Sequence, residues 1–427
     1  MYLCWKKRRQ AVPQKQKLTG SFCISLDLRY LCHIKPYYKI MLTDKPYRID
    51  LVDALRGFAV MAIMLLHNIE HFNLYAFPEP PSELIAKIDS GIWNTMFFLF
   101  GGKAYALFAL LFGFSFHIQY TNYARKGGDF RWRYMWRLVL LFGLGCLNAA
   151  FFPGEVLVLY AMVGFVLVPV CRLDNKAVLV IAIILMLQPY EWGKFFYAMF
   201  NPEYKANLAW VEYSKKMSPF LQDSNFWAMV KSNLWNGQLF SHIWAWEYGR
   251  FFQTASLFML GMLLGRKGLF AKPEEHKTFW IRTLAIAVVC FIPLFYVSDI
   301  ITFENKVMTG SMKTILQSLR NFSFMTILAS LFVIGWQNIS IQKIFKRLCP
   351  YGKMSLTNYI TQSMVGSFVY FGYGLALFNV VSTTASFGIG LLMLAAQYLF
   401  CCWWLKNHRY GPFEYIWRKG TWAFSKT

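Results

Sequence analysis

Long runs of apolar residues, separated by short polar or basic segments, recur along the chain from residue 51 to residue 405. A helix needs about 20 mainly apolar residues to cross a bilayer, and most of these runs approach that length. The pattern predicts ten membrane-spanning helices, at approximately 51–72, 92–120, 135–152, 155–172, 177–198, 249–266, 280–299, 322–337, 354–376 and 384–405. Gly101-Gly102-Lys103 interrupts the second run, so this helix is expected to bend or break. Gln188-Pro189 falls inside the fifth run, which makes it the weakest of the ten predicted spans.

The composition is typical of a membrane protein. Hydrophobic residues make up 57% of the 427 residues and charged residues only 15%, whereas a soluble domain carries about a quarter charged residues. Because the apolar runs are long and continuous, the sequence predicts an all-α, polytopic helical membrane protein and not a barrel. We expect one membrane domain over 45–427, with a large external loop of polar, Trp-rich sequence at about 199–248.

The first 44 residues form a separate basic segment without an apolar run long enough to span a membrane. They also lack the apolar core and small-residue cleavage site of a signal peptide. Residues 1–44 are therefore expected to be a disordered cytoplasmic tail, or to lie upstream of a natural start at Met41.

Positive charge gathers in alternate connecting segments. The net charge of +23 could by itself indicate a nucleic-acid-binding protein. With the N-terminus inside, however, the basic loops fall on the cytoplasmic side, as the positive-inside rule requires. This distribution predicts that both termini are cytoplasmic and that nucleic acid is not a partner. The nine cysteines lie in the tail, in spans or in a cytoplasmic loop, so external disulfides are not expected.

The first span carries charged residues at one end and a polar cluster at the other. Asp53 and Arg56 can pair at the inner face, or Arg56 can bind an anionic group such as phosphate. The eleven residues from Arg56 to His67 rise about 16 Å along a helix. His67 is the candidate general base, with Glu70 or His71 orienting or replacing it. A depth-setting ion pair and a packed histidine are the structural alternatives.

The segment from His67 to His71 also matches the H-x-x-E-H pattern of inverted zinc proteases. Such enzymes need a further metal ligand and a soluble cleft, whereas this pattern ends a membrane helix. We therefore expect no metal.

Five further polar residues fall within or beside the predicted spans: Lys103, His117, Glu155, Asn358 and Gln362. A lysine inside a span must pair or face a polar cavity, so Lys103 is a candidate functional or essential charge. His117 could equally be a packed residue, and Glu155 suits the N-terminus of its helix. Asn358 and Gln362 share a helix face that could line a site or bond to a neighbouring helix.

Five stretches in order resemble the YeiB-like family of bacterial multi-pass membrane proteins, a domain of unknown function. They are DALRG at 53–57, FALLFG at 108–113, GEVLVLYA at 154–161, GKMSLTNY at 352–359 followed by Gln362-Ser363, and YGPFEYIWR at 410–418. The resemblance covers about 48–420. The family is in turn similar to the transmembrane acyltransferases, such as lysosomal heparan glucosaminide acetyltransferase and bacterial polysaccharide O-acetyltransferases.

In the latter enzymes a Leu-Arg-Gly is followed by a histidine, and the spacing from Arg56 to His67 matches this pattern. Many YeiB-like proteins have asparagine at the position of His67, so the histidine is tied to the acyltransferases and not to the YeiB-like pattern. The resemblance implies a protein of the bacterial cytoplasmic (inner) membrane. It also implies that acyl-coenzyme A is reached from the cytoplasm, with Asp53 and Arg56 at the donor.

The function expected from the residues and the resemblance together is acyl transfer to a hydroxyl or amine of a cell-envelope acceptor. That acceptor would be a glycan or a lipid-linked molecule in contact with the lipid bilayer. A transporter or exporter would use the same buried charges as a substrate path. A non-catalytic membrane scaffold would need them only for structure. The sequence indicates neither the acyl group nor the oligomeric state.

Overall fold

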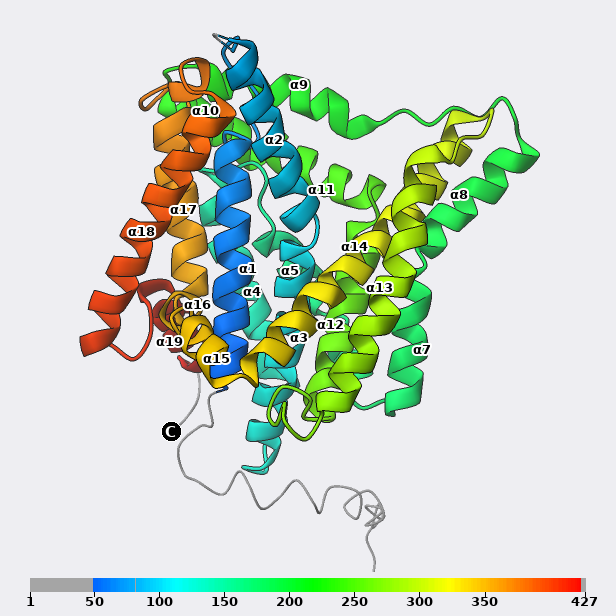
Figure 1. Ribbon diagram of the computed structural model, residues 1–427, viewed down its shortest axis with the longest axis vertical. Helices are drawn as coiled ribbons and strands as arrows, with labels where there is room; N and C mark the ends of the chain where they lie inside the picture. The colour runs from blue at the N-terminus through cyan, green and yellow to red at the C-terminus, as the bar shows by residue number, and fades with distance from the viewer. Residues whose placement is uncertain (1–48, 81, 424–427) are drawn as a thin grey trace, which may run out of the picture. The chain divides into compact units, whose positions relative to one another are not determined.

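The computed structural model describes residues 49–80 and 82–423 (Figure 1). Helices make up 78% of the structure and the described residues contain no strand, so the predicted all-α fold is confirmed. The predicted tail, 1–44, lies outside the described residues, and so does the proposed start at Met41.

The helices follow the predicted runs in order. Those of the first half are α1 (Asp50–Ile69), α2 (Glu83–Phe100), α3 (Ala104–Ala124), α4 (Arg131–Ala149), α5 (Leu157–Gly164), α6 (Leu167–Val170), α7 (Asn175–Met186) and α8 (Pro189–Phe200). The polar, Trp-rich segment then forms α9 (Ala209–Gln222), α10 (Phe226–Ser232), a π-helical turn (Asn233–Gly237) and α11 (Gln238–Glu247). The second half consists of α12 (Arg250–Arg266), α13 (Lys277–Ile300), α14 (Lys306–Trp336), α15 (Ile339–Lys346), α16 (Cys349–Lys353), α17 (Ser355–Tyr370), a 3₁₀ turn (Leu377–Asn379), α18 (Thr383–Asn407) and α19 (Pro412–Trp422).

Several of these helices have the character of membrane spans. Within the described residues, five segments are long and apolar enough to cross a bilayer: Asp50–Ile69, Glu83–Ala124, Lys277–Ile300, Lys306–Trp336 and Thr383–Asn407. The pair α7 and α8, bent by 44°, makes a sixth if it forms one span. Each of the other predicted runs also overlaps a helix, but one that is shorter or less apolar.

The expected interruption of the second run is present, the fifth run is also divided, and each break has a backbone cause. Gly102 separates α2 from α3 with a φ of +73°, a left-handed conformation that glycine adopts readily. Gln188 has a φ of +58° and precedes Pro189, which has no N–H to continue the hydrogen bonds of α7. The fourth predicted span is also divided, into the short helices α5 and α6.

One helix is much longer than predicted. The apolar run begins near residue 322, but α14 has 31 residues and begins at Lys306. The side chain of Asn305 caps it by accepting hydrogen bonds from the N–H groups of Val307 and Met308. The N-terminal half of α14 is therefore more polar than the predicted span and joins it in one continuous helix. The apolar pattern alone does not reveal this half.

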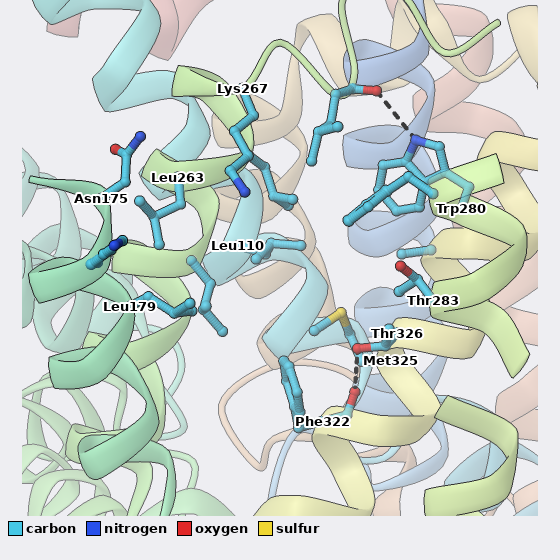
Figure 2. Close-up of a pocket in the computed structure, with 16 residues that line it drawn as sticks. Leu110, Asn175, Leu179, Leu263, Lys267, Trp280, Thr283, Phe322, Met325 and Thr326 are labelled. Carbon is cyan, nitrogen blue, oxygen red and sulfur yellow. Dashed lines mark hydrogen bonds between the residues drawn. The ribbon is translucent and has the colours of Figure 1, made fainter. Parts of the chain in front are cut away.

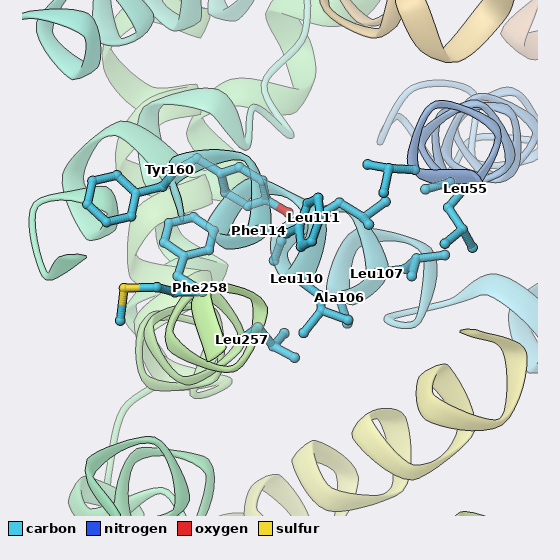
Figure 3. Close-up of a cluster of buried hydrophobic side chains, with 14 of the residues drawn as sticks. Leu55, Ala106, Leu107, Leu110, Leu111, Phe114, Tyr160, Leu257 and Phe258 are labelled. Carbon is cyan, nitrogen blue, oxygen red and sulfur yellow. The ribbon is translucent and has the colours of Figure 1, made fainter. Parts of the chain in front are cut away.

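The helix α1 packs against α2, α3, α16, α17 and α18 (Figure 1). Its backbone approaches α16 so closely that a side chain on Gly352 would collide with the carbonyl oxygen of Asp53. Figure 3 shows part of the largest core cluster, which includes Leu55 of α1, Leu111 of α3 and Phe258 of α12. Small residues at such crossings let membrane helices pack at short range. With α14 and α15, which also contact it, α1 has seven neighbouring helices that hold its side chains in fixed positions.

Candidate functional site

At the N-terminal end of α1, Arg56 lies between an acid and a hydroxyl. Its guanidinium donates to Oδ1 of Asp53 at 3.0 Å and to Oγ of Ser115, on α3, at 2.6 Å. Asp53 is buried, whereas the Arg56 side chain is 24% exposed. The predicted pairing of Asp53 and Arg56 is therefore present, and the helix spacing of three residues explains it.

Two more arginines approach this end of α1 from other helices. Arg137 of α4 stacks on the indole of Trp417, with its guanidinium carbon 3.5 Å from the ring centre. The indole N–H of Trp417 donates to the Arg137 carbonyl at 2.9 Å. Arg56 and Arg418 lie close enough to Arg137 for their charges to act on it. Three arginines, from α1, α4 and α19, therefore lie within electrostatic range at this cationic end of α1, and guanidinium groups suit an oxyanion such as phosphate.

At the other end of α1, His67 and Glu70 form a pair. Nδ1 of His67 lies 3.5 Å from Oε2 of Glu70, and the Tyr75 hydroxyl donates to Oε1 of Glu70 at 3.1 Å. The imidazole packs on the ring of Phe152, with centroids 4.5 Å apart. Nε2 of His67 has no hydrogen-bond partner among the described residues, and the side chain is 17% exposed. Because the Glu70 carboxylate lies beside Nδ1, Nε2 of the neutral ring is available to accept a proton.

His71 has a different environment. Its Nδ1 bonds the carbonyl oxygen of Ala76 at 2.7 Å, its Nε2 lies 2.6 Å from Oγ of Ser386, and its ring stacks on Tyr370. The carbonyl can only accept, so Nδ1 carries the proton and Nε2 accepts from the serine. His71 lies beyond the end of α1, and burial lowers its pKa to about 4. Both nitrogens are thus used to hold the turn after α1.

The H-x-x-E-H segment does not gather its residues around one point, because His67 and His71 bond different partners. Across residues 49–80 and 82–423, no group of three or more His, Cys, Asp and Glu side chains is placed to hold a metal ion.

A buried polar group is connected to His67 through Phe152. Glu155 is 2% exposed, and its carboxylate accepts from the Asn148 amide and from the N–H of Leu157, the first residue of α5. Tyr359 of α17 lies within electrostatic range of the Glu155 carboxylate. The Phe152 N–H donates to the Asn148 carbonyl, which links this group to the ring that supports His67.

Gln362, one turn beyond Tyr359 on α17, is fully buried. Neither its amide nitrogen nor its amide oxygen, nor the Tyr359 hydroxyl, has a hydrogen-bond partner in the described part of the chain. Because buried polar atoms are nearly always satisfied in native proteins, these groups are candidates for contact with a bound molecule.

The other predicted residues make specific contacts. Lys103 is 7% exposed, and its ammonium donates to the carbonyl oxygen of Phe97 at 3.2 Å. The amide of Asn358 donates to the Tyr351 carbonyl at 3.0 Å, which fits its alternative as a structural residue. Nε2 of His117 lies 3.4 Å from the Thr121 hydroxyl, and the imidazole packs against Gly265 of α12.

A cavity of about 390 Å³ lies elsewhere, between α3, α7, α12, α13 and α14 (Figure 2). Its walls are mainly leucine and aromatic side chains such as Leu263 and Trp280, with Lys176 and Lys267 also lining it. None of the predicted site residues lines this cavity.

The sequence reasoning missed Ser115, Arg137 and Arg418 as neighbours of Arg56. Ser115 is an ordinary small residue within an apolar run, and no local signal distinguishes it. Arg137 and Arg418 belong to basic segments that were assigned to the cytoplasmic loops as a group. The signal available was the alternation of Arg with Trp at 131–137, since arginine and tryptophan often stack.

Comparison with known proteins places the chain among bacterial relatives. Residues 264–424 match the family model DUF418, described as a protein of unknown function. The uncharacterized protein YxaH of Bacillus subtilis (strain 168) is 25% identical over 407 residues, covering 88% of this chain and 94% of YxaH. The uncharacterized protein YeiB of Escherichia coli (strain K12) is 26% identical over 387 residues, covering 87% and 95%. An uncharacterized 39.9 kDa protein in the amylase 3′ region of Bacillus acidopullulyticus is 22% identical over 393 residues, covering 88% and 94%. The chain is therefore similar over most of its length to YxaH and YeiB, and its C-terminal part matches the DUF418 model.

Proposed function

We propose that the protein is a multi-pass acyltransferase of the bacterial cytoplasmic (inner) membrane. It would move an acyl group from cytoplasmic acyl-coenzyme A to a hydroxyl or amine of a cell-envelope acceptor such as a glycan or a lipid-linked molecule. The observation that carries the proposal is the His67–Glu70 pair, which shares one helix with the arginine at the cationic end. A base oriented by a carboxylate is the arrangement that activates a hydroxyl or amine.

The proposed topology has ten spans and cytoplasmic termini. The helices α1, α2 with α3, α4, α5 with α6, α7 with α8, α12, α13, α14, α17 and α18 would be the spans. The basic loops then face the cytoplasm, as the positive-inside rule requires, and α9 to α11 lie outside. In this orientation Arg56 is at the cytoplasmic face and His67 toward the outer face.

The donor would bind at the cytoplasmic end of α1. Coenzyme A carries phosphates, and guanidinium groups bind phosphate with two parallel hydrogen bonds. Arg56, Arg137 and Arg418 approach one another there from three helices. Asp53 compensates part of their charge and fixes the rotamer of Arg56.

The position of His67 relative to Arg56 suits an extended donor. Eleven residues correspond to about three helical turns, so both side chains lie on one face of α1, about 16 Å apart. A donor that lies along this face with its phosphates at Arg56 would carry its thioester toward His67. This separation lets one helix hold both ends of the donor.

The transfer step would need one base and one polarising group. Nε2 of His67 would take the proton from the acceptor hydroxyl or amine, whose oxygen or nitrogen attacks the thioester carbon. The carbon–sulfur bond then breaks, and the coenzyme A thiolate leaves and takes up the proton from His67. Gln362 and Tyr359 would stabilise the carbonyl oxygen as its negative charge develops, since their polar atoms are buried and have no partner in the described structure.

The test begins with donor binding by the full chain in detergent. Acetyl-coenzyme A should raise the melting temperature in proportion to the logarithm of its concentration above the Kd. Arg56→Lys keeps the charge but loses the planar fork, so it should weaken this binding while the protein stays folded. Unchanged coenzyme A affinity in that variant would assign Arg56 to structure or topology.

A transporter is the alternative that the buried charges also permit. It would depend on several coupling groups, whereas the proposed enzyme depends on one base above all. An acylated product formed by the purified protein would indicate the enzyme. Transport into vesicles without any acylated product would indicate the transporter.

A further inference from the structure

Two cations, the buried Lys103 and the half-buried Arg250, lie near the break between α2 and α3. Lys103 directly follows Gly102, near the middle of the candidate span Glu83–Ala124. A Cβ on Gly102 would lie 3.2 Å from a guanidinium nitrogen of Arg250 and 2.6 Å from the amide nitrogen of Asn321. Arg250 begins α12 and Asn321 lies within α14. Three helices thus bring donor groups to one glycine.

Neither cation is matched by an acid in the described structure. The Lys103 ammonium contacts the Phe97 carbonyl and lies over the rings of Phe98 and Phe324, at 5.9 Å and 5.6 Å from their centres. Carbonyl and aromatic groups lower the cost of a buried charge, but they do not neutralise it.

Arg250 is likewise held by neutral groups. One of its nitrogens donates to the Gln253 amide oxygen at 2.9 Å, and its guanidinium lies 4.9 Å from the Tyr105 ring centre and 5.6 Å from that of Trp244. These contacts fix the orientation of the planar fork and add no negative charge. The fork is therefore held in place before any anion binds.

Arg320 adds to the excess of positive charge near Lys103. Arg320 lies close enough to Lys103 to act on its charge, but its guanidinium is paired with Asp299 at 3.1 Å and also donates to Ser298. The described cluster therefore contains three cations and one carboxylate. Like charges repel strongly where the surroundings are apolar, so an anion between Lys103 and Arg250 would be favoured.

We propose that Lys103, Arg250 and Asn321 form a binding site for an oxyanion, a phosphate or carboxylate group of a ligand. An ammonium, a planar guanidinium and an amide N–H₂ are complementary to such a group. Gly102 has no side chain to occupy the space beside the Arg250 guanidinium and the Asn321 amide. The site is separate from the arginines around Arg56, and the proposal holds whether or not the protein transfers acyl groups.

The experiment measures the melting temperature of the full chain in dodecyl maltoside with two probes. The first is sodium phosphate, compared with sodium chloride at equal ionic strength. The second is dioleoylphosphatidylglycerol in mixed micelles, compared with dioleoylphosphatidylcholine. A rise with inorganic phosphate identifies a free anion as sufficient, and a rise with the anionic lipid alone identifies a lipid headgroup as the source. No rise with either probe overturns the proposal.

Substitutions of Lys103 and Arg250 test whether the probes raise the melting temperature by binding at this site. Lys103→Met and Arg250→Gln should each weaken probe binding roughly 10-fold to 100-fold, the loss expected for a charged hydrogen bond. The exposed Arg282→Gln, outside both proposed anion sites, should keep the rise. Lys103→Met should melt no lower than the parent chain without probe, because the substitution relieves charge repulsion.

Loss of stability without loss of probe binding would mean that Lys103 and Arg250 have only a structural role. If Lys103→Met melts well below the parent and still shows the full probe-dependent rise, the proposal is wrong. Should both variants fail to fold, Arg250→Lys provides the test, since it keeps the charge and should still bind the probe about 10-fold more weakly. Parent-like binding by Arg250→Lys would overturn the role of the guanidinium.

Discussion

His67, in the last turn of α1, and His71, just beyond the helix, differ in what their nitrogens contact. His67 shares one nitrogen with Glu70, whereas His71 bonds a carbonyl and a hydroxyl and stacks on Tyr370. The same residue type therefore has a candidate chemical role at one position and a structural role four residues later. This difference leads to opposite expectations for their substitution.

His67→Ala should reduce acyl transfer roughly 100-fold to 10,000-fold, the usual contribution of a general base. Donor binding and the melting temperature should change little, because the proposed phosphate contacts lie at the other end of α1. His67→Asn should be almost as damaging, since an amide does not accept a proton near pH 7. Initial rates and acetyl-coenzyme A affinity measured side by side test this, with the exposed His408→Gln as the matched control. Full activity in His67→Asn would move the base elsewhere.

His71 should make the fold sensitive to acid. Its pKa is lowered to about 4 in the folded protein from an ordinary 6.5, so folding favours the neutral ring. That stability is fully present above pH 6.5 and is lost as the pH falls toward 4, by up to roughly 3 kcal/mol. The melting temperature should therefore fall between pH 7.5 and pH 5. His71→Gln should melt lower at pH 7.5 but show a smaller fall, and an equal fall in both proteins would contradict the assignment.

At the scale of elements, the close approach of α1 and α16 controls where the ends of α1 lie. Leu348 and Gly352 face Gly57 and Asp53 across this crossing, and glycines on both helices allow backbone contact. The crossing therefore fixes the depth and rotation of the helix that carries Arg56 and His67.

Gly352→Ala should strongly destabilise the protein, because the new methyl group would collide with the Asp53 backbone and cannot move aside. Overpacking of this kind costs about 1–3 kcal/mol or more. Gly388→Ala, within α18, is the matched control, since nothing lies within 4 Å of the added carbon. The melting temperature in detergent should fall for the first variant and stay level or rise for the second. Parent-like behaviour of Gly352→Ala would show that the two helices can separate without cost.

At the scale of the whole molecule, the orientation across the membrane connects the two ends of α1 with two compartments. The proposal requires donor and acceptor to arrive from opposite sides, so a reversed or mixed topology would exclude it. The positive-inside rule supplies the expected direction.

Single cysteines introduced at exposed loop positions test the orientation. Lys215→Cys, in α9, should react with an impermeant maleimide on intact cells, and Lys126→Cys, after α3, should react only after the membrane is opened. The parent chain, with its own cysteines, supplies the background. Labelling of Lys126→Cys from outside, with none at Lys215→Cys, would reverse the proposed topology.

The sequence by itself determined the helical fold and the order of its elements. An apolar run of this length can satisfy its backbone groups in lipid only as a helix, so composition and periodicity are sufficient. It also determined the breaks, because Gly102 and Pro189 act locally through their own backbone geometry. The pairing of Asp53 with Arg56 followed from helical spacing alone.

Only the tertiary structure decided which polar residues from distant helices meet. Helical periodicity assigns a residue to a face of its own helix but does not determine which other helix covers that face. The approach of Arg250 and Asn321 to Gly102, and the contact of His71 with Ser386, depend on how bulky and small side chains interlock between helices far apart in the chain. Those contacts are long-range, and no local sequence pattern specifies them.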